Sequence, residues 1–324
     1  MAPAAVEAFD HRRRSAAGCL CCGSHRLRRE VQIISGFLAA RAWQGRPELT
    51  ELVCCEDCGL HFFDRGLDDA EVARYYHGYR DAEYQRSRYK WEPFYTAGQH
   101  ASLLAWSDSG SRRDNLRHSL SRAAAPTFFN SVLDHGGSQG HMLAAVEATR
   151  KAVYDPSARP AVEGLESYSQ AGDLPRDWAL ILSCQVLEHT SSPTAYLQHI
   201  HALLGEDGWL YVEVPNESWH PAIGPEALRK RVLRTLLQMR PLLIAADVLC
   251  TVLRVKYRRL PPLGFVAMRE HLNYFTAESL TALLERNGFQ VATCGIDNGG
   301  QLFAVARKFA TGAARTPNTA DGAA

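Results

Sequence analysis

Residues 131–143 read SVLDHGGSQGHML, and this stretch decides the fold class. An apolar run leads to Asp134, glycines follow at positions 136, 137 and 140, and a helical pattern then continues to Thr149. Glycine lets the backbone approach a ligand closely, and the first turn of a helix offers free N–H groups to an anion. The stretch therefore predicts a strand, a ligand-binding turn and a helix over His141–Thr149.

The sequence around the glycines alternates between strand and helix patterns. Strands are expected at Ser131–Asp134, Lys151–Asp155, Trp178–Ser183 and Gly208–Val214, with a helix at Pro193–Leu204. A last helix, Thr276–Asn287, precedes two strands, Gln290–Gly295 and Gln301–Lys308, whose short glycine-containing link indicates an antiparallel pair. This order predicts an α/β fold with a doubly wound, Rossmann-like sheet.

The spacing of the glycines indicates which of two classes of nucleotide-binding turn this stretch resembles. The dinucleotide pattern G-x-G-x-x-G fails from either of the first two glycines, because other residues stand where the pattern needs glycine. This argues against NAD and FAD. The pattern acidic-x-G-x-G-x-G fits better, with Asp134, Gly136 and Gly140 in place and Ser138 replacing the middle glycine.

Four further motifs follow the turn. They are Tyr154–Ser157 (YDPS), Leu182–His189 (LSCQVLEH), Gly208–Asn216 (GWLYVEVPN) and His271–Phe275 (HLNYF). Together with the glycine turn, in this order, they resemble the class I S-adenosylmethionine-dependent methyltransferases over about residues 125–308. The resemblance implies a methyltransferase domain that uses S-adenosylmethionine as its cofactor.

The resemblance also implies site residues. Asp155 would take the ribose hydroxyls, and the full cofactor-binding set would be Asp134, Gly136, Gly137, Ser138, Gly140, Asp155, Ser183, Gln185 and Glu188. A general base for an acceptor hydroxyl or activated C–H is expected at His189, which follows the fourth strand, or at His271. Simpler interpretations stay open: Asp155 as a turn residue, Glu188 and His189 as a helix cap or surface pair, and either histidine as a structural hydrogen-bonding group.

Six of the nine cysteines lie in the first 58 residues and include two matched C-x-x-C-G turns. These turns can present four thiolates to one tetrahedral zinc ion, from Cys19, Cys22, Cys55 and Cys58. Cys21 and Cys54 flank these positions and are alternative ligands. Four thiolates leave no open coordination position, so the zinc is expected to be structural. A thioredoxin-like dithiol would lack its usual βαβ context.

The paired cysteine turns narrow the resemblance. A zinc module before a methyltransferase domain is similar to the sugar C-methyltransferase-type branch, whose members act on sugars or sugar nucleotides in polysaccharide and antibiotic pathways. Such proteins typically have a tyrosine-rich helical link, and aromatic residues are frequent here over residues 75–95. These rings can close over the cofactor or pack the zinc module onto the catalytic domain.

The expected domain boundaries follow from these motifs. They are a zinc-binding module over 16–65 with a strand-like middle at 31–43, a helical aromatic-rich link over 66–125, and a methyltransferase domain over 126–309 with a helical insertion at about 217–270. Residues 1–15 and 310–324 are rich in small residues, and we expect them to be disordered.

The insertion is locally basic. Residues 226–259 carry nine Lys and Arg against two acidic residues, and nine minus two gives a net charge of +7. Three interpretations stay open: a solvated helical face, a site for a phosphorylated substrate, or peripheral contact with an anionic membrane surface. For the last, the apolar face would comprise Leu242, Leu243, Ile244, Val248, Leu249 and Val252.

Composition limits the classes of function. The chain has 324 residues, of which 46% are hydrophobic and 22% charged, which fits a globular protein of about two domains. A net charge of +1 argues against a nucleic-acid partner. No secretory signal or membrane-spanning stretch is visible, so we expect a cytoplasmic protein.

The expected function is methyl transfer to a small-molecule acceptor, such as a sugar, a sugar nucleotide, or a polysaccharide or natural-product intermediate. The alternative is an inactive methyltransferase-fold scaffold that binds partners. Two features favour this alternative: Ser138 within the glycine turn, and an adenine-binding loop in which Asp173 is only a weak candidate acid.

Overall fold

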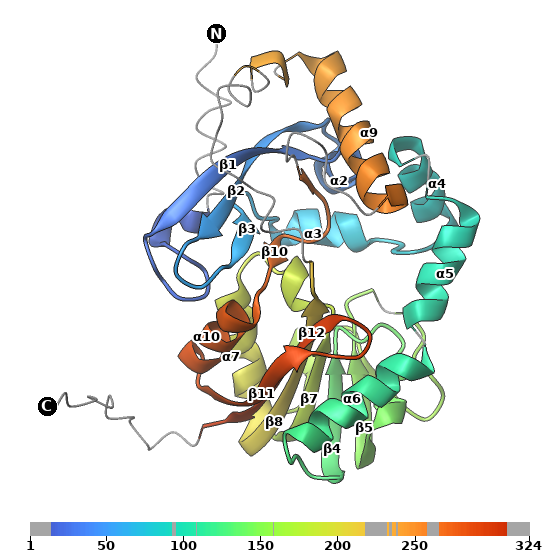
Figure 1. Cartoon of the computed structure of the whole chain (residues 1–324). Coiled ribbons are helices and arrows are strands. Elements are labelled where there is room, and N and C mark those ends of the chain that lie inside the picture. The colour runs from blue at the N-terminus through green and yellow to red at the C-terminus, as the bar shows by residue number, and fades with distance from the viewer. Residues whose placement is uncertain are drawn as a thin grey trace, which may run out of the picture.

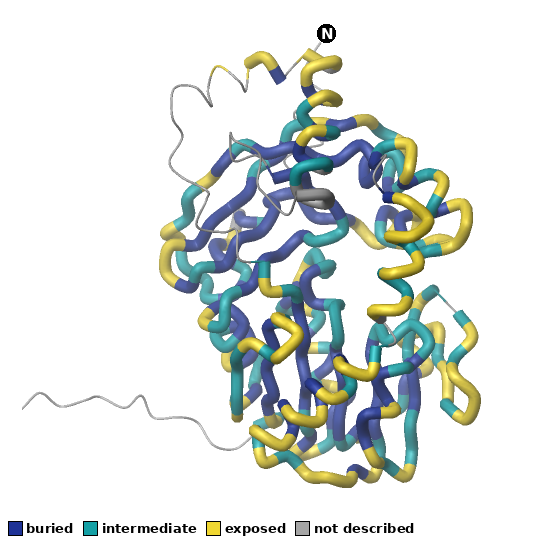
Figure 2. The backbone as a smooth tube through the Cα atoms, turned by 45° about the vertical axis from the view of Figure 1, so that its right-hand side comes forward, coloured by how far each residue is buried: buried dark blue, intermediate teal, exposed yellow. Residues whose placement is uncertain are grey.

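The structure is a computed structural model that describes residues 14–92, 95–107, 109–157, 159–217, 232, 235–237, 239–257 and 266–309. It contains two sheets, which lie one above the other in Figure 1. The lower sheet has seven strands and the upper sheet has five. Strands of both sheets are largely buried, whereas exposed residues gather in loops and outer helices (Figure 2).

The seven-stranded sheet has the order β11-β12-β8-β7-β4-β5-β6. Its strands are β4 (Phe128–His135), β5 (Glu147–Tyr154), β6 (Glu166–Tyr168), β7 (Trp178–Cys184), β8 (Leu204–Pro215), β11 (Phe289–Ile296) and β12 (Gln301–Lys308). The strands from β4 to β8 pair in parallel, and β12 and β11 add an antiparallel edge. The expected α/β, doubly wound fold is therefore confirmed, as is the antiparallel last pair.

Helices cover both faces of this sheet. α7 (Pro193–Leu203) and α10 (Ala277–Arg286) pack on one face, in a cluster that includes Leu133 and Ile181 of the strands. α6 (Gly110–Arg122) packs on the other face, in a cluster with Val132 and Leu180. Successive residues of a strand point to opposite faces, so the continuous apolar runs of β4 and β7 supply both layers.

The structure corrects the helix expected at His141–Thr149. Only a short 3-10 helix, η2 (His141–Ala145), forms there, and β5 already begins at Glu147. β5 pairs with β4 from its first residue to its last. The hydrogen bonds of the sheet outweigh the helical pattern of this stretch, and α6 packs against η2 on the face that a longer helix would cover.

The five-stranded sheet has the order β10-β3-β2-β1-β9. β1 (Leu27–Ile34), β2 (Glu48–Cys55) and β3 (His61–Phe63) are antiparallel neighbours. The strand pattern expected over residues 31–43 ends at Ile34. The Ser35 hydroxyl then accepts a hydrogen bond from Leu38 N–H and caps a helix, α2 (Gly36–Trp43), which its alanine and leucine residues favour.

Two short strands from the C-terminal third complete this upper sheet. β9 (Ala267–Met268) pairs in parallel with β1, and β10 (Asn273–Tyr274) pairs antiparallel with β3. In the sequence these residues lie between β8 and β11 of the lower sheet, but they extend the N-terminal sheet at both of its edges. The two sheets are therefore interlocked, and the boundary expected near residue 65 separates parts that share one sheet.

The aromatic-rich link forms α3 (Asp69–Tyr76), α4 (Ala82–Trp91) and α5 (Ala97–Ser107), followed by α6. Within the insertion, α9 (Arg240–Tyr257) packs against β1 and β9 through a cluster that includes Leu243, Cys250 and Ile33. In the part of the chain that the structure describes, no helix combines the length and apolar character needed to cross a bilayer.

The two ends that we expected to be disordered lie mostly outside the described residues, which begin at Arg14 and stop at Phe309. Arg14 and Ser15 are an exception, because they form part of a 3-10 helix, η1 (Arg14–Ala17). The Ser15 hydroxyl donates to Asp64 Oδ1 at 2.6 Å and is buried. The expectation of disorder was wrong for these two residues, because long-range hydrogen bonds hold them.

Candidate functional site

The carboxyl ends of β4, β5 and β7 lie at the edge of the lower sheet that faces the upper sheet (Figure 1). Ligands of parallel α/β sheets bind at this edge. The glycine turn follows β4, Asp155 follows β5, and a 3-10 helix, η4 (Leu187–His189), follows β7. The topology thus brings together three of the segments that the sequence singled out.

The glycine turn surrounds a buried acid. Asp134 has no exposed surface, and neither oxygen of its carboxylate has a hydrogen-bond partner among the described residues. Burial raises the pKa of Asp134 to about 7. A Cβ atom on Gly137 would lie 2.2 Å from this carboxylate, so the turn can close over the acid only with glycine at that position.

Asp155 is tied to the same turn. Its Oδ2 accepts a hydrogen bond from the N–H of Ser138 at 2.8 Å, and its Oδ1 accepts one from the N–H of Ser157 at 2.9 Å. Ser138 has a φ of +54°, while Gly136 and Gly140 have φ of +80° and +82°. These left-handed conformations suit glycine, so Ser138 stands where a side chain is disfavoured.

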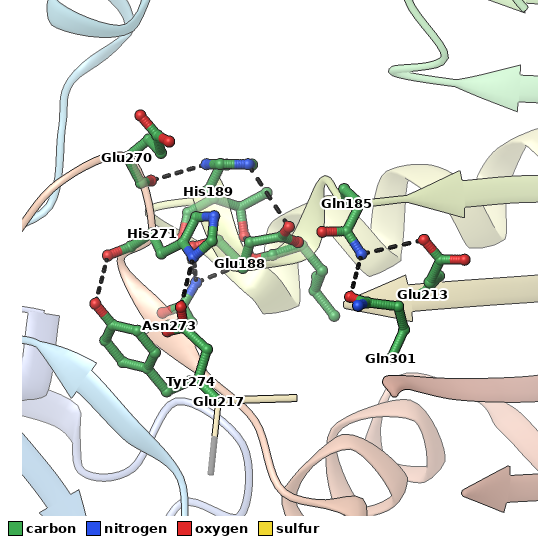
Figure 3. A network of polar contacts seen from close by, with 12 residues as sticks. Gln185, Glu188, His189, Glu213, Glu217, Glu270, His271, Asn273, Tyr274 and Gln301 are labelled. Carbon is green, nitrogen blue, oxygen red and sulfur yellow. Dashed lines mark hydrogen bonds and ion pairs between the residues drawn. The ribbon is translucent and has the colours of Figure 1, made fainter. Parts of the chain in front are cut away.

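Two of the expected cofactor residues use their side chains within the protein. The hydroxyl of Ser183, on β7, is buried and lies 2.8 Å from the hydroxyl of Tyr196 on α7. Gln185, just past β7, donates from Nε2 to Glu213 Oε1 at 3.1 Å and to Gln301 Oε1 at 3.2 Å (Figure 3). Gln185 thereby links the end of β7 to β8 and β12.

A buried ion pair beside Gln185 was missed by the sequence analysis. Arg112 of α6 donates to Glu213 of β8, which has no exposed surface. The positive charge of Arg112 also favours the charged form of Asp134, although burial outweighs this effect. The sequence did contain a signal for this pair: Glu213 is a charged residue in the otherwise apolar stretch 208–214, and a buried charge requires a partner.

The third part of the site joins two distant segments. Glu188 and His189 lie in η4, and His271 directly precedes Leu272 and β10. The rings of His189 and His271 have centroids 4.9 Å apart, and His189 Nε2 lies 3.6 Å from Glu188 Oε1 (Figure 3). The two histidines expected as alternative bases are therefore neighbours, and the surface-pair interpretation of Glu188 does not hold because Glu188 is buried.

The electrostatic environments of these groups differ. Burial raises the pKa of Glu188 to about 8 and lowers the pKa of His189 to about 4. Burial also opposes charge on His271, but the carboxylate of Glu217, 3.5 Å from its Nδ1, outweighs this and raises the pKa of His271. Of the two imidazoles, His271 is the more basic.

Hydrogen bonds lock the two segments of this cluster together. Asn273 of β10 donates from Nδ2 to the carbonyl oxygens of Leu187 at 3.0 Å and Thr190 at 2.8 Å. Its Oδ1 accepts from Arg14 Nη2 at 2.6 Å, and Arg14 Nε donates to the carbonyl of Ser191 at 2.8 Å. No local sequence signal reveals the role of Arg14.

The tyrosines of the link pack against the upper sheet and reach the histidine pair, whereas closure over the cofactor stays a prediction. Tyr75 and Tyr84 are buried around Phe37 of α2, so they pack the link onto the upper sheet. The Tyr75 hydroxyl donates to Glu270 Oε2 at 2.5 Å. Tyr76 lies edge-on to His189 with ring centroids 6.2 Å apart, so the link also reaches the histidine pair.

The four cysteines predicted as zinc ligands converge. Their sulfur atoms all lie within 4.8 Å of one another, with Cys19 and Cys58 at 3.6 Å and Cys22 and Cys55 at 3.5 Å. Two ligands of a tetrahedral zinc ion with Zn–S bonds of 2.3 Å would be about 3.8 Å apart. The flanking Cys21 and Cys54 are not part of this group.

The basic stretch 226–259 is described in part. On α9, Leu243 is buried, whereas Leu242, Ile244 and Leu249 are exposed. The described part packs on the upper sheet, and its basic side chains lie outside the described residues or are not placed. The solvated face, the phosphorylated-substrate site and the membrane contact stay predictions.

The model of the family described as methyltransferase domain matches residues 109–293. No curated protein matches the sequence.

Solved structures with a similar fold include two distant ones. The 1,6-didemethyltoxoflavin-N1-methyltransferase of Burkholderia thailandensis is 18% identical, over 64% of this chain and 83% of that chain, with a TM-score of 0.41. The N,N-8-amino-8-demethyl-D-riboflavin dimethyltransferase of Streptomyces davawensis is 16% identical, over 71% and 60% of the two chains, with a TM-score of 0.42.

Proposed function

The chain belongs to the methyltransferase domain family and is an S-adenosylmethionine-dependent methyltransferase, and on this premise we propose that its acceptor is a small molecule, a sugar or a sugar nucleotide. One observation supports placing the reaction at the glycine turn. The buried carboxylate of Asp134 lies under this turn and has no hydrogen-bond partner among the described residues. Buried polar groups need partners, so this acid is suited to a ligand with donor groups.

The residues at this edge fit the cofactor. The ammonium group of its methionine part offers donors to the acid under the turn, and Asp155, at the end of the next strand, would hold the ribose hydroxyls. When bound, the cofactor supplies a methyl carbon activated by a positively charged sulfur. The protein therefore needs to hold an acceptor in line with that carbon and to exclude water.

We assign removal of the acceptor proton to the cluster of Glu188, His189 and His271. The cluster lies at the same sheet edge as the glycine turn, and Tyr76 beside His189 offers an aromatic surface to a sugar ring. General-base assistance is worth about 10²–10⁴-fold in rate. The resemblance to sugar C-methyltransferases and the paired cysteine turns support the acceptor class.

Calorimetry of the full chain with S-adenosylmethionine tests the cofactor assignment. We expect binding, and about tenfold to hundredfold weaker binding by Asp155→Ala, because a charged acceptor of hydrogen bonds is lost. Asp114→Ala, which removes an exposed carboxylate on α6, is the matched control and should bind normally. Absence of binding by the unmutated protein would overturn the assignment.

Mass spectrometry tests the acceptor. Incubation with S-adenosylmethionine and a panel of sugar nucleotides should add the mass of one CH₂ group to at least one of them. If the cofactor binds but no sugar nucleotide gains this mass, while another class of small molecule does, the acceptor class is wrong and the methyltransferase assignment stands.

We also propose that Cys19, Cys22, Cys55 and Cys58 hold a structural zinc ion, which the convergence of their sulfur atoms supports. The hydroxyl of Thr276 donates to the carbonyl of Cys58 at 3.0 Å, so the ion would stiffen a turn that contacts the N-terminus of α10. Elemental analysis should find one zinc per chain, and Cys55→Ser should reduce it whereas Cys294→Ser should not. A disulfide among the four cysteines would contradict the proposal.

A catalytically weak methyltransferase-fold scaffold is the second candidate function, and the φ of +54° at Ser138 is the observation that favours it. A strained residue in the turn can weaken cofactor binding. Ligands that bind only the folded state raise the melting temperature. No thermal shift with either S-adenosylmethionine or S-adenosylhomocysteine would support the scaffold.

A further inference from the structure

Besides the cysteine group, the described residues contain one other cluster with the donor atoms of a metal site. One ligand atom from each of Glu188, His189 and His271 lies within 4.8 Å of the other two. Two ligands on one metal ion with bonds near 2.1 Å can be at most about 4.2 Å apart. The three side chains would therefore need only small movements to share an ion.

The Nδ1 atoms of His189 and His271 have the kinds of neighbours that are typical of metal-ligating histidines. His189 Nδ1 lies 2.8 Å from the carbonyl oxygen of Glu270, which can only accept a hydrogen bond, so Nδ1 carries the proton. Its Nε2 is left with a lone pair and faces Glu188 Oε1 at 3.6 Å. His271 has the carboxylate of Glu217 beside its Nδ1 at 3.5 Å. Metal-ligating histidines almost always have such a carbonyl or carboxylate partner.

Glu188 supplies an independent indication. Its side chain is 1% exposed, and neither of its oxygens has a hydrogen-bond partner among the described residues. An unpartnered carboxylate in this position is unfavourable, and a cation between it and the two imidazoles would satisfy all three groups. Figure 3 shows the side chains of Glu188, His189 and His271 next to one another.

The backbone holds these ligands on fixed elements. The N–H of Leu272, next to His271, donates to the carbonyl of Glu188 at 2.8 Å. Asn273 adds its bonds to the carbonyls of Leu187 and Thr190. His189 and Glu270 are 81 residues apart in the sequence, yet a hydrogen bond joins them directly at the cluster. Such pre-arrangement favours ion binding, because little chain ordering remains to be done.

We propose that Glu188, His189 and His271 bind a divalent transition-metal ion, which holds an oxygen atom of the methyl acceptor. Two imidazoles and one carboxylate suit Mn²⁺, Fe²⁺, Co²⁺ or Zn²⁺ better than Mg²⁺ or Ca²⁺, which prefer oxygen ligands. Three protein ligands leave coordination positions for water or an acceptor oxygen. The part that concerns the acceptor rests on the proposed function, whereas ion binding does not. With the ion bound, the three side chains would be ligands and would no longer take the acceptor proton themselves. The ion would instead lower the pKa of the acceptor hydroxyl bound to it, and the proton would leave to water.

Electron paramagnetic resonance with Mn²⁺ tests the site, because bound Mn²⁺ loses the six-line signal of the free ion. The full chain is used after zinc has been supplied to the cysteines. We expect one Mn²⁺ per chain, at least about tenfold weaker binding by Glu188→Gln and by His271→Ala, and about tenfold to hundredfold weaker binding by Glu217→Gln.

His118→Ala, which removes an exposed histidine on α6, is the matched control and should bind Mn²⁺ normally. Glu188→Gln keeps the shape of the side chain, and its melting temperature checks that it folds. The proposal is overturned if the unmutated protein takes up no Mn²⁺, Co²⁺ or Zn²⁺ beyond the cysteine site. It is also overturned if all variants bind the ion as tightly as the unmutated protein.

Calorimetry with S-adenosylmethionine separates this proposal from the proposed function. Cofactor binding without ion binding would refute only the ion site, and ion binding without cofactor binding would refute only the methyltransferase assignment. If both bind, and if the ion holds an acceptor oxygen, adding the acceptor should alter the spectrum of bound Mn²⁺. Removal of the ion should then lower turnover and leave the affinity for the cofactor unchanged. An unaltered spectrum with full turnover of the ion-free protein would contradict the acceptor role.

Discussion

At the scale of single residues, the site depends on small side chains placed against buried charge. Asp134 is fully buried, and the turn that covers it passes so close that position 137 has no room for a Cβ atom. Gly137 is therefore required by the neighbouring carboxylate rather than by its own backbone angles. The buried acid and the glycine form one unit, in which neither can change alone.

This unit gives a first prediction. Gly137→Ala should displace the carboxylate of Asp134 or the turn, so we expect cofactor affinity to fall by at least about tenfold and the free energy of unfolding to fall by about 1–3 kcal/mol, the usual range for overpacking. Calorimetry and chemical denaturation measure the two quantities. Gly172→Ala is the control, because nothing lies within 4 Å of its added Cβ. Equal behaviour of the two variants would refute the argument.

At the scale of elements, α9 is attached to the upper sheet by a buried acid. Asp247 of α9 is 2% exposed, and its Oδ2 accepts a hydrogen bond from the N–H of Gly36 at the start of α2 at 2.7 Å. Burial raises the pKa of Asp247 from 3.8 to about 7. The carboxylate thus connects two helices that are far apart in the sequence, but its charge is unfavourable there.

The sign of the resulting pH dependence follows from linkage. Between pH 4 and pH 7 the folded state keeps a proton on Asp247 that the unfolded state releases, so this group's contribution to stability falls as the pH rises through that window. Asp247→Asn keeps an oxygen acceptor for Gly36 and removes the charge. We expect the variant to be more stable than the unmutated protein at pH 8, by up to about 2 kcal/mol, and to lose this advantage at pH 5.

Urea denaturation at pH 5 and pH 8 measures this difference. Asp207→Asn, which alters an exposed carboxylate of β8, is the control and should show little effect at either pH. A stability difference that is the same at both pH values would show that the charge of Asp247 is not the cause.

Elements also show where a local pattern is reliable. The expected starts of α7 and α10 are confirmed to within one residue. Ser192 and Thr276 cap these helices by accepting hydrogen bonds from N–H groups three residues ahead. The helix expected after the glycine turn was wrong, because the alanines of that stretch suit a helix while its pairing with β4 requires a strand from Glu147. Local propensity decides a segment only where no neighbouring strand competes for its backbone.

At the scale of the whole molecule, the two sheets act as one unit. Arg14 is half-buried and donates to carbonyl oxygens of Phe63 in the upper sheet and of Thr190 and Ser191 beside η4. It also donates to Asn273, whose own strand β10 belongs to the upper sheet. One side chain therefore links the sheet edge that carries the site to the sheet that covers it.

This arrangement gives a prediction for the intact protein. Arg14→Ala leaves several carbonyl groups without their donor, so we expect the free energy of unfolding to fall by about 3 kcal/mol or more and turnover to fall through misplacement of η4. Arg26→Ala removes an exposed guanidinium and should have little effect. Both sheets should still unfold in one transition, which circular dichroism and tyrosine fluorescence would follow together. Separate transitions would contradict the interlocked arrangement.

The sequence by itself determined the sheet of the catalytic part, the glycine turn over Asp134 and the position of Asp155 beside it, because strand periodicity and turn chemistry are local properties. Only the tertiary structure decided that β9 and β10 complete the N-terminal sheet, that Arg14 hydrogen-bonds both to the upper sheet and to residues beside η4, and that Glu188 and His189 meet His271. These features depend on contacts between distant segments, and such contacts form because strand edges and buried charges need partners wherever in the chain those partners lie.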